Sequence, residues 1–250
     1  MMAMLLLLAS CLVVGIFIGA VGVGGVLLVP ALMMFARLSV HQAAATALFS
    51  FLFTGILGGG LFSRRGTIDW KVAGPICAGA FALSFAGAAV GSRIPAPVLM
   101  WVIAAILLAA GLYIVLPHTR RKTEVRVHGE RRGMAGLLGI GAVSGFGAGI
   151  SGAGGPLFSV PIMLALQFDP LVAVGAGQVV QIASSFSGSL GNMAHGSIQY
   201  GLALPVTLVE LIGVLLGVRI AHAARGSHLR LGAAVLCMIS AVGMAVKTLA

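Results

Sequence analysis

Hydrophobic and polar residues in this chain separate into long apolar blocks and short polar gaps. The apolar blocks are residues 3–36, 42–62, 72–92, 98–116, 134–168, 171–193, 200–220 and 231–249. Most of them are close to the roughly 20 residues that a helix needs to cross a membrane. A membrane β-barrel would instead alternate polar and apolar positions in segments of about ten residues. The pattern therefore predicts an all-α, polytopic integral membrane protein with about eight to ten helices.

Composition supports the same class. Of the 250 residues, 60% are hydrophobic and only 8% are charged, whereas a soluble domain carries about 25% charged residues. Such a chain lacks the polar residues needed to cover a water-facing globule. This excludes a cytosolic enzyme, a disulfide-stapled secreted domain and a disordered tail.

The formal net charge of +10 is concentrated in a few gaps, because nine of the 15 basic residues lie within residues 64–71 and 120–132. Basic chains often bind nucleic acid, but Lys and Arg in short loops between apolar blocks are typical of the cytoplasmic side of membrane proteins. We therefore expect contacts with membrane lipids and none with nucleic acid. No basic residue precedes Arg37, so the first block is interpreted as a retained helix and not as a cleaved signal.

Neither a cofactor nor a metal is expected from the sequence. The three cysteines lie far apart within apolar blocks, and the six histidines lack the spacing of metal ligands. Residues 147–152 match the G-x-G-x-x-G pattern, but a dinucleotide site would need a preceding strand and a soluble crossover helix. Close packing of helices is the simpler interpretation of these glycines.

An internal repeat relates the two ends of the chain. Gly22-Val23-Gly24-Gly25 aligns with Gly152-Ala153-Gly154-Gly155, and we term the offset that places Gly22 on Gly152 the repeat shift. After a length change of four residues, 87–94 align with 213–220, and both segments read G-x-x-x-G-x-R-I. We predict two homologous halves, 1–117 and 134–250, joined by a basic loop at 118–133.

The first block of each half is too long for one straight span, because 34 residues would form a helix of about 51 Å against a hydrocarbon core of roughly 30 Å. Glycine clusters followed by prolines interrupt both blocks. If each broken block crosses an even number of times, the halves are inverted repeats, with three basic residues on the amino-terminal side and twelve opposite. A single net crossing gives eight spans and a split of ten and five. The steeper asymmetry favours inverted repeats with the amino terminus outside.

The breaks also suggest a binding site. A helix that begins inside the membrane presents unpaired N–H groups and a positive dipole end, which suits an anion, and transporters with two related halves place such helices around the substrate. Gly24, Gly25, Gly154 and Gly155 are therefore candidate binding residues, with close packing as the alternative.

Polar residues within apolar blocks are further candidates, because intramembrane polarity is costly and usually functional. The candidates are Thr46, Gln178, Gln181, Ser185 and Asn192; the last four, with Ser189, follow one helical stripe. Hydrogen bonding between neighbouring helices is the alternative.

Glu210 is the only acid deep within an apolar block. Arg219 lies about 180° around the same helix, so it is no partner on that face. We expect either proton coupling or a structural hydrogen bond to another helix.

The glycine clusters and the residues that follow them resemble the sulfite exporter TauE/SafE family, which includes toluene sulfonate uptake permeases. That family repeats G-x-G-G-G and L-x-x-P in each half. The two copies here are Gly22-Val23-Gly24-Gly25-Val26-Leu27-Leu28-Val29-Pro30 and Gly152-Ala153-Gly154-Gly155-Pro156-Leu157-Phe158-Ser159-Val160-Pro161. The resemblance adds Pro30 and Pro161 to the site, and it implies movement of sulfite, sulfonates or other small organic anions across the cytoplasmic membrane of a prokaryote.

These observations together predict a secondary transporter that works by alternating access between its two halves, without being an enzyme. A membrane-embedded enzyme and a passive anion channel remain the alternatives. No Ser/His/Asp or metal constellation is visible that would support the enzyme.

Overall fold

The computed structural model describes residues 2–22, 24–115, 132–166, 168–194 and 198–223, and the pairs 238–239, 241–242 and 245–246. Within these ranges the chain forms nine α-helices and one 3₁₀ helix, with no β-strand. Six of the helices are long and apolar enough to cross a membrane. The prediction of an all-α, multi-pass membrane protein is confirmed. Nearly all of the predicted loop at 118–133 and most of the block at 231–249 lie outside the described residues.

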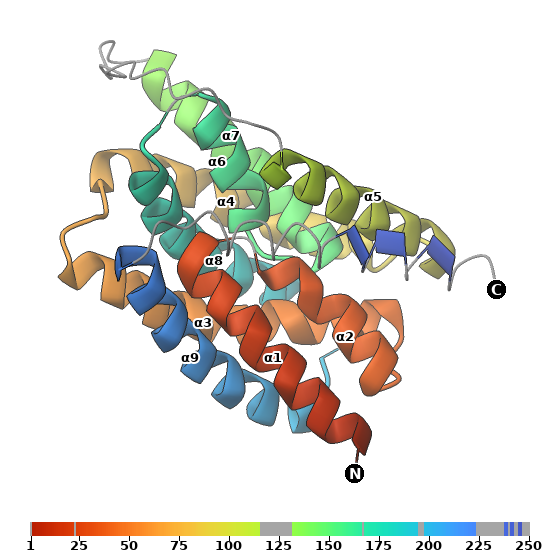
Figure 1. Ribbon diagram of the computed structural model, residues 1–250. Coiled ribbons are helices and arrows are strands. Elements are labelled where there is room, and N and C mark those ends of the chain that lie inside the picture. Colours follow the sequence, from red (N-terminus) through yellow and green to blue (C-terminus); the bar gives the residue numbers. More distant parts are fainter. Residues whose placement is uncertain are drawn as a thin grey trace.

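The helices follow the apolar blocks closely, and Figure 1 shows them as one bundle. Their bounds are α1 Met2–Val21, η1 Gly25–Leu27, α2 Leu28–Phe35, α3 Val40–Arg64, α4 Trp70–Gly91, α5 Ala96–Val115, α6 Arg132–Ser151, α7 Pro156–Ala165, α8 Pro170–Met193 and α9 Tyr200–Ala223. At about 1.5 Å per residue, the long helices match the roughly 30 Å of hydrocarbon that they have to cross.

Polar residues in the gaps begin three of the long helices. Ser39 and Gln42 form a capping box at the start of α3, in which each side chain binds the backbone N–H of the other residue. Asp69 accepts a hydrogen bond from the N–H of Lys71 at the start of α4, and Asp169 does the same for Leu171 at the start of α8. These side chains satisfy N–H groups that the first turn of a helix leaves free.

Two pairs of helices run parallel and in close contact across the two halves. In the first pair, Gly15 and Gly19 of α1 lie against the backbone of Glu210 and Val214 of α9, so that a Cβ at either glycine would overlap the opposite chain. The second pair joins α4 and α6, where Gly145 packs on the backbone of Ala80 in the same way. Small residues allow this approach and gain van der Waals contact, which holds helices together in a membrane.

Helix α3 is antiparallel to α8, its counterpart in the predicted repeat. Gly55 of α3 lies against Ile182, whereas Leu48, earlier along α3, lies against Gly188, later along α8. Helix α3 is parallel to α9, because Thr46 contacts Gln199 near their starts and Arg65, just after the end of α3, contacts Val218 near the end of α9. Since α9 is also parallel to α1, α1 and α3 run in the same direction and α2 brings the chain back between them (Figure 1). These directions agree with inverted repeats, which stay a prediction.

Contacts between helices recur at the repeat shift that places Gly22 on Gly152. The matching pairs are Gly15 with Glu210 and Gly145 with Ala80, Gly19 with Val214 and Gly149 with Ser84, and Gly217 with Ile16 and Gly87 with Phe146. The same shift therefore relates α4 to α9, and the contacts do not follow the four-residue change that the G-x-x-x-G-x-R-I alignment introduced. That alignment paired glycines because their residue types agree. The contacts instead pair residues that face the same part of the neighbouring helix.

The described basic side chains lie at the two ends of the bundle. Arg64, Arg65, Lys71 and Arg219 lie where α3 and α9 end and α4 begins, which we term the basic end. Arg37 and Arg93 lie at the opposite end, where α3 begins and α4 and α8 end; we term this the amino-terminal end. The counterpart of the Arg64 gap, near His195, lies outside the described residues.

Candidate functional site

Both predicted breaks are present, and glycine forms them in the same way. Helix α1 ends at Val21, and Gly22 follows with φ of 77° and an N–H bond of 3.1 Å to the carbonyl of Ile18. Helix α6 ends at Ser151, and Gly152 follows with φ of 69°. This left-handed conformation is strained for residues with a side chain, and it turns the chain back into the bundle at each break.

The two short helices that follow, α2 and α7, begin beside each other at the centre of the bundle. A Cβ at Gly25, just before α2, would lie 2.7 Å from the carbonyl oxygen of Ala153 and 2.9 Å from the ring of Phe51. Gly154, with φ of 81°, also packs against this ring. Phe51 stands midway along α3, so the positive ends of both helix dipoles converge on the middle of the membrane span.

Polar groups of α8 and α3 surround this centre. The Nε2 atom of Gln181 donates to the carbonyl of Phe51 at 3.0 Å and to Oγ1 of Thr54 at 2.8 Å. The hydroxyl oxygen of Ser184 accepts a 3.2 Å hydrogen bond from the N–H of Gly155, the N-cap residue of α7. Neutral donors and two helix amino termini in a region of low dielectric constant are an arrangement that can stabilise an anion.

The remaining predicted residues are spread along the bundle. Gln178 donates to the carbonyl of Ile18 at 2.8 Å, and Gly24 packs against Val14 and Ile18 on the same helix. Thr46 accepts a 3.0 Å hydrogen bond from the N–H of Gln199. Pro30 is buried within α2, Pro161 is half-buried within α7, and Asn192 lies at the amino-terminal end. The structure thus groups Gly25, Gly154, Gly155 and Gln181 at the centre and places the others away from it.

The predicted stripe on α8 is completely internal. Gln178, Gln181, Ser185, Ser189 and Asn192 are all at most 8% exposed. Five buried polar atoms make no hydrogen bond within the described residues: Ser159 Oγ, Gln178 Oε1, Ser185 Oγ, Ser189 Oγ and Glu210 Oε1. Each such atom costs about 1–3 kcal/mol if it stays unpaired. They represent hydrogen-bonding capacity that the described chain does not use, which is typical of functional sites.

Glu210 connects the two halves through a hydrogen bond. Its side chain is fully buried on α9, and Oε2 lies 2.8 Å from the hydroxyl of Ser50 on α3. The same hydroxyl lies 2.9 Å from the carbonyl of Ala47. Because a serine hydroxyl carries a single hydrogen, it donates to only one of these oxygens at a time.

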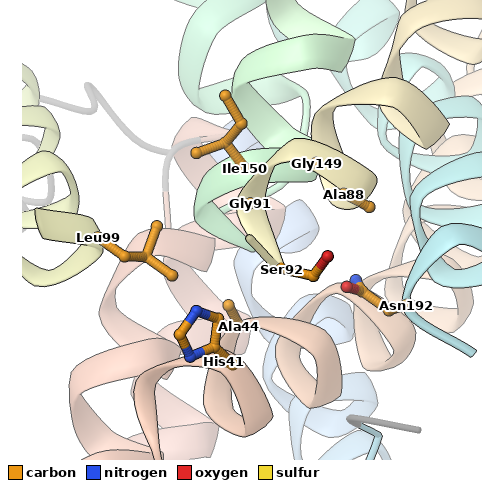
Figure 2. A pocket seen from close by; sticks show the side chains of 9 residues that line it. All are labelled: His41, Ala44, Ala88, Gly91, Ser92, Leu99, Gly149, Ile150 and Asn192. Carbon is orange, nitrogen blue, oxygen red and sulfur yellow. The ribbon is translucent and has the colours of Figure 1, made fainter. Parts of the chain in front are cut away.

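A small cavity opens at the amino-terminal end, and Figure 2 shows the side chains around it. His41 of α3, Asn192 of α8 and Ser92, just after α4, provide its polar groups, while Ala44 and Ala88 form part of its apolar wall. Its volume is about 10 Å³, enough for roughly one water molecule.

Metal ligation has little support in the described chain. No three His, Cys, Asp or Glu side chains within the described ranges are grouped as a metal ion would require. Cys11 is buried, Cys77 is half-buried, and both are free thiols. Cys237 lies outside the described residues.

Sequence reasoning missed Phe51, His41 and Ser92. The repeat shift places Phe51 on Gln181, so applying this shift to every polar candidate would have identified it. His41 and Ser92 stand at helix ends in the sequence, and no local pattern indicates that the two ends meet.

Comparison with known proteins gives a consistent result. The family model described as "Sulfite exporter TauE/SafE" matches residues 7–244. The chain is similar to "Probable membrane transporter protein YdhB" of Bacillus subtilis, with 28% identity over 86% of this chain and 89% of that protein. It is also similar to "Probable membrane transporter protein YunE" of the same organism, with 26% identity over 83% of this chain and 86% of that protein. No solved structure matches the chain.

Proposed function

The chain belongs to the sulfite exporter TauE/SafE family, and from this premise we propose that it is a secondary transporter of small anions in the cytoplasmic membrane of a prokaryote. Sulfite, sulfonates and other small organosulfur or organic anions are the proposed substrates. The six spanning helices and the transporter names of its relatives support the general function.

One observation carries the choice of an anion: the amino-terminal ends of α2 and α7 converge at Phe51. Both helices point their positive dipole ends at the same place, and Gly25 and Gly154 bring the backbone close to it. Glu210, the only acid within the described spanning helices, lies on α9 and binds Ser50, the neighbour of Phe51. In the protonated form proposed below it adds no negative charge to this centre. A small anion is therefore the ligand that the charges of this centre favour.

The tight helix pairs support a proposal about which parts move during transport. Helices α1 and α9 share a glycine seam, and so do α4 and α6, so each pair is expected to move as one body. Rocking of one pair against the other, about α3 and α8, would open the centre to alternate sides. Each moving body then combines helices from both halves of the sequence.

Glu210 is proposed to carry the coupling proton. A protonated carboxyl would donate to the Ser50 hydroxyl, which would then donate to the carbonyl of Ala47, and this chain uses every available hydrogen. Within the part of the chain that the structure describes, an ionised carboxylate would be buried without a cationic partner, which is costly. Cys11 is the titratable side chain that α1 places within electrostatic reach of Glu210, and α3 faces it with the neutral Ser50.

Proteoliposomes containing the purified chain would test the transport function. We expect a pH gradient to drive methanesulfonate to a higher concentration on one side, while protein-free liposomes show no such uptake. Equilibration without accumulation would indicate a passive channel, and chemical conversion of the anion would indicate an enzyme; either result would contradict a carrier.

Ser184→Ala tests the central site in the same assay. The substitution removes the hydroxyl that binds the N–H of Gly155, so we expect weaker methanesulfonate transport. Ser10→Ala is the matched control, because that hydroxyl lies on α1 and binds the carbonyl of Leu6 on the same helix. Equal effects of the two substitutions would remove Ser184 from the site.

A further inference from the structure

The cavity at the amino-terminal end has a filled counterpart at the basic end. Positions related by the repeat shift make equivalent contacts: Gly152 packs on Ala44, and Gly22 packs on Val174. At the equivalent positions, Val174 replaces Ala44, Val218 replaces Ala88, and Phe62 replaces Asn192. Phe62 is fully buried. The fold is therefore open to a small extent at one end and closed by larger apolar side chains at the other.

The cavity adjoins the second break of the chain. Ala44 belongs to its wall and touches Gly152, the glycine that ends α6. Gly149 and Ile150, in the last turn of α6, also line the cavity. From this break the chain continues to Gly155 and the amino-terminal end of α7, so Gly152, which touches the cavity wall, lies three positions along the chain from the proposed anion site.

The polar groups of the cavity suit a hydrated anion. The side-chain amide of Asn192, a residue only 8% exposed, makes no hydrogen bond with the described residues. Nε2 of His41 donates to the carbonyl of Ile94 at 3.0 Å, and the hydroxyl of Ser92 donates to the carbonyl of Ala89 at 2.9 Å. The Asn192 amide is therefore the donor among these three groups that no bond within the described residues engages. The hydroxyl of Ser92 lies beside the Asn192 amide (Figure 2).

Charge at this end also favours an anion. The described cations at the amino-terminal end, Arg37 and Arg93, are exposed. Asp69 and Asp169, the described acids outside the spanning segments, stand where α4 and α8 begin, at the basic end. Concentration of cations without acids around an entrance raises the local concentration of anions.

Resting on the transport function proposed above, we propose that this cavity is the outer mouth of the anion path. The amide of Asn192 donates to a small oxyanion as it loses water, with Ser92 and His41 beside it. Phe62, Val174 and Val218 close the path at the cytoplasmic end in this conformation. The basic end is assigned to the cytoplasm because Lys and Arg concentrate on that side of membrane proteins. A volume of about 10 Å³ is too small for an oxyanion, so the mouth widens when an anion passes.

Thiol labelling of a matched pair tests this assignment. Ala44→Cys and Val174→Cys occupy equivalent positions, and each is made in a chain whose native Cys11, Cys77 and Cys237 are replaced by serine. A charged, membrane-impermeant maleimide is added to intact cells, so that it reaches only the outer face of the membrane. It is expected to modify the Ala44→Cys variant about tenfold faster than the Val174→Cys variant, because reaction requires access to the thiolate. Methanesulfonate is expected to slow the reaction at position 44.

Ser92→Cys gives a second reporter at the half-buried edge of the mouth, in case a thiol at position 44 disturbs the packing against Gly152. Equal labelling of positions 44 and 174, no labelling at 44 and 92, or labelling of both only from the cytoplasmic side would overturn the assignment. Labelling needs no transport, so a chain that labels as expected but moves no anion would refute the proposed function and leave the position of the mouth intact.

Discussion

Substitution of Glu210 by glutamine isolates the proposed proton from the structure around it. The amide has nearly the shape of a protonated carboxyl and can donate to the Ser50 hydroxyl, so the chain from Ser50 to Ala47 is retained. A retained hydrogen bond implies a change in the free energy of unfolding of under about 1 kcal/mol. The amide carries no exchangeable charge state, so proton transfer through this position is lost.

The size of the effect follows from one carboxyl and one proton. A pH difference of one unit is worth about 1.36 kcal/mol per proton, which supports a tenfold concentration ratio of a co-transported anion. We therefore expect the unmodified chain to accumulate methanesulfonate about tenfold at zero membrane potential. The Glu210→Gln variant should show no accumulation, although it should still let methanesulfonate move down its own concentration gradient.

The assay uses proteoliposomes with the potential clamped at zero by potassium and valinomycin and with a pH step of about one unit. Methanesulfonate is chosen because its conjugate acid is strong, so no neutral form crosses the lipid and accumulates by itself. Asp169→Asn is the matched control: it makes the same acid-to-amide change at the N-cap of α8, where asparagine also caps. Tenfold accumulation by Glu210→Gln would refute the proton role, as would equal losses in both variants.

Three further substitutions test the packing. Gly154→Ala should lower the free energy of unfolding by about 1–2 kcal/mol, because alanine is strained at φ of 81°. Gly60→Ala is the control, because it lies on a helix with open space beside it. Equal melting temperatures of the two variants would contradict the prediction. Gly15→Leu should separate α1 from α9 and lower the melting temperature of the detergent-solubilised protein, and Gly139→Leu, with no atom near its Cβ position, serves as control. Gln181→Leu should lower the free energy of unfolding by about 0.6–1.7 kcal/mol. An unchanged free energy would mean that its hydrogen bonds to Phe51 and Thr54 contribute nothing to stability.

The sequence predicted the helices and their breaks well, because both depend on local composition. Apolar blocks indicated the spans, and Gly22 and Gly152, the glycines that turn the chain, were within the predicted clusters. The repeat shift that relates these two glycines was also visible. The register of α4 against α9 was wrong by four residues, because a glycine pattern repeats every turn and letters alone do not show which turn faces the neighbour.

The site was predicted only in part. Gly25, Gly154, Gly155 and Gln181 come together, because the breaks that the sequence shows are the features that enter the centre. Asn192 was assigned to the same stripe as Gln181, but on a helix of this length the ends of a stripe lie far apart. Which residues of another helix meet each end, such as His41 at the cavity, depends on tertiary packing, which a single sequence does not report.

The pairing of α1 with α9 has a consequence for how the protein is made. Helix α1 leaves the ribosome well before α9, and its glycine surface receives its partner only after α2 to α8 have been synthesised. Until then this surface is covered by lipid, by the translocation machinery or by a chaperone. Contacts between segments so distant in sequence make assembly slow, so a chain that stops before α9 would expose the seam and become a substrate for membrane proteases.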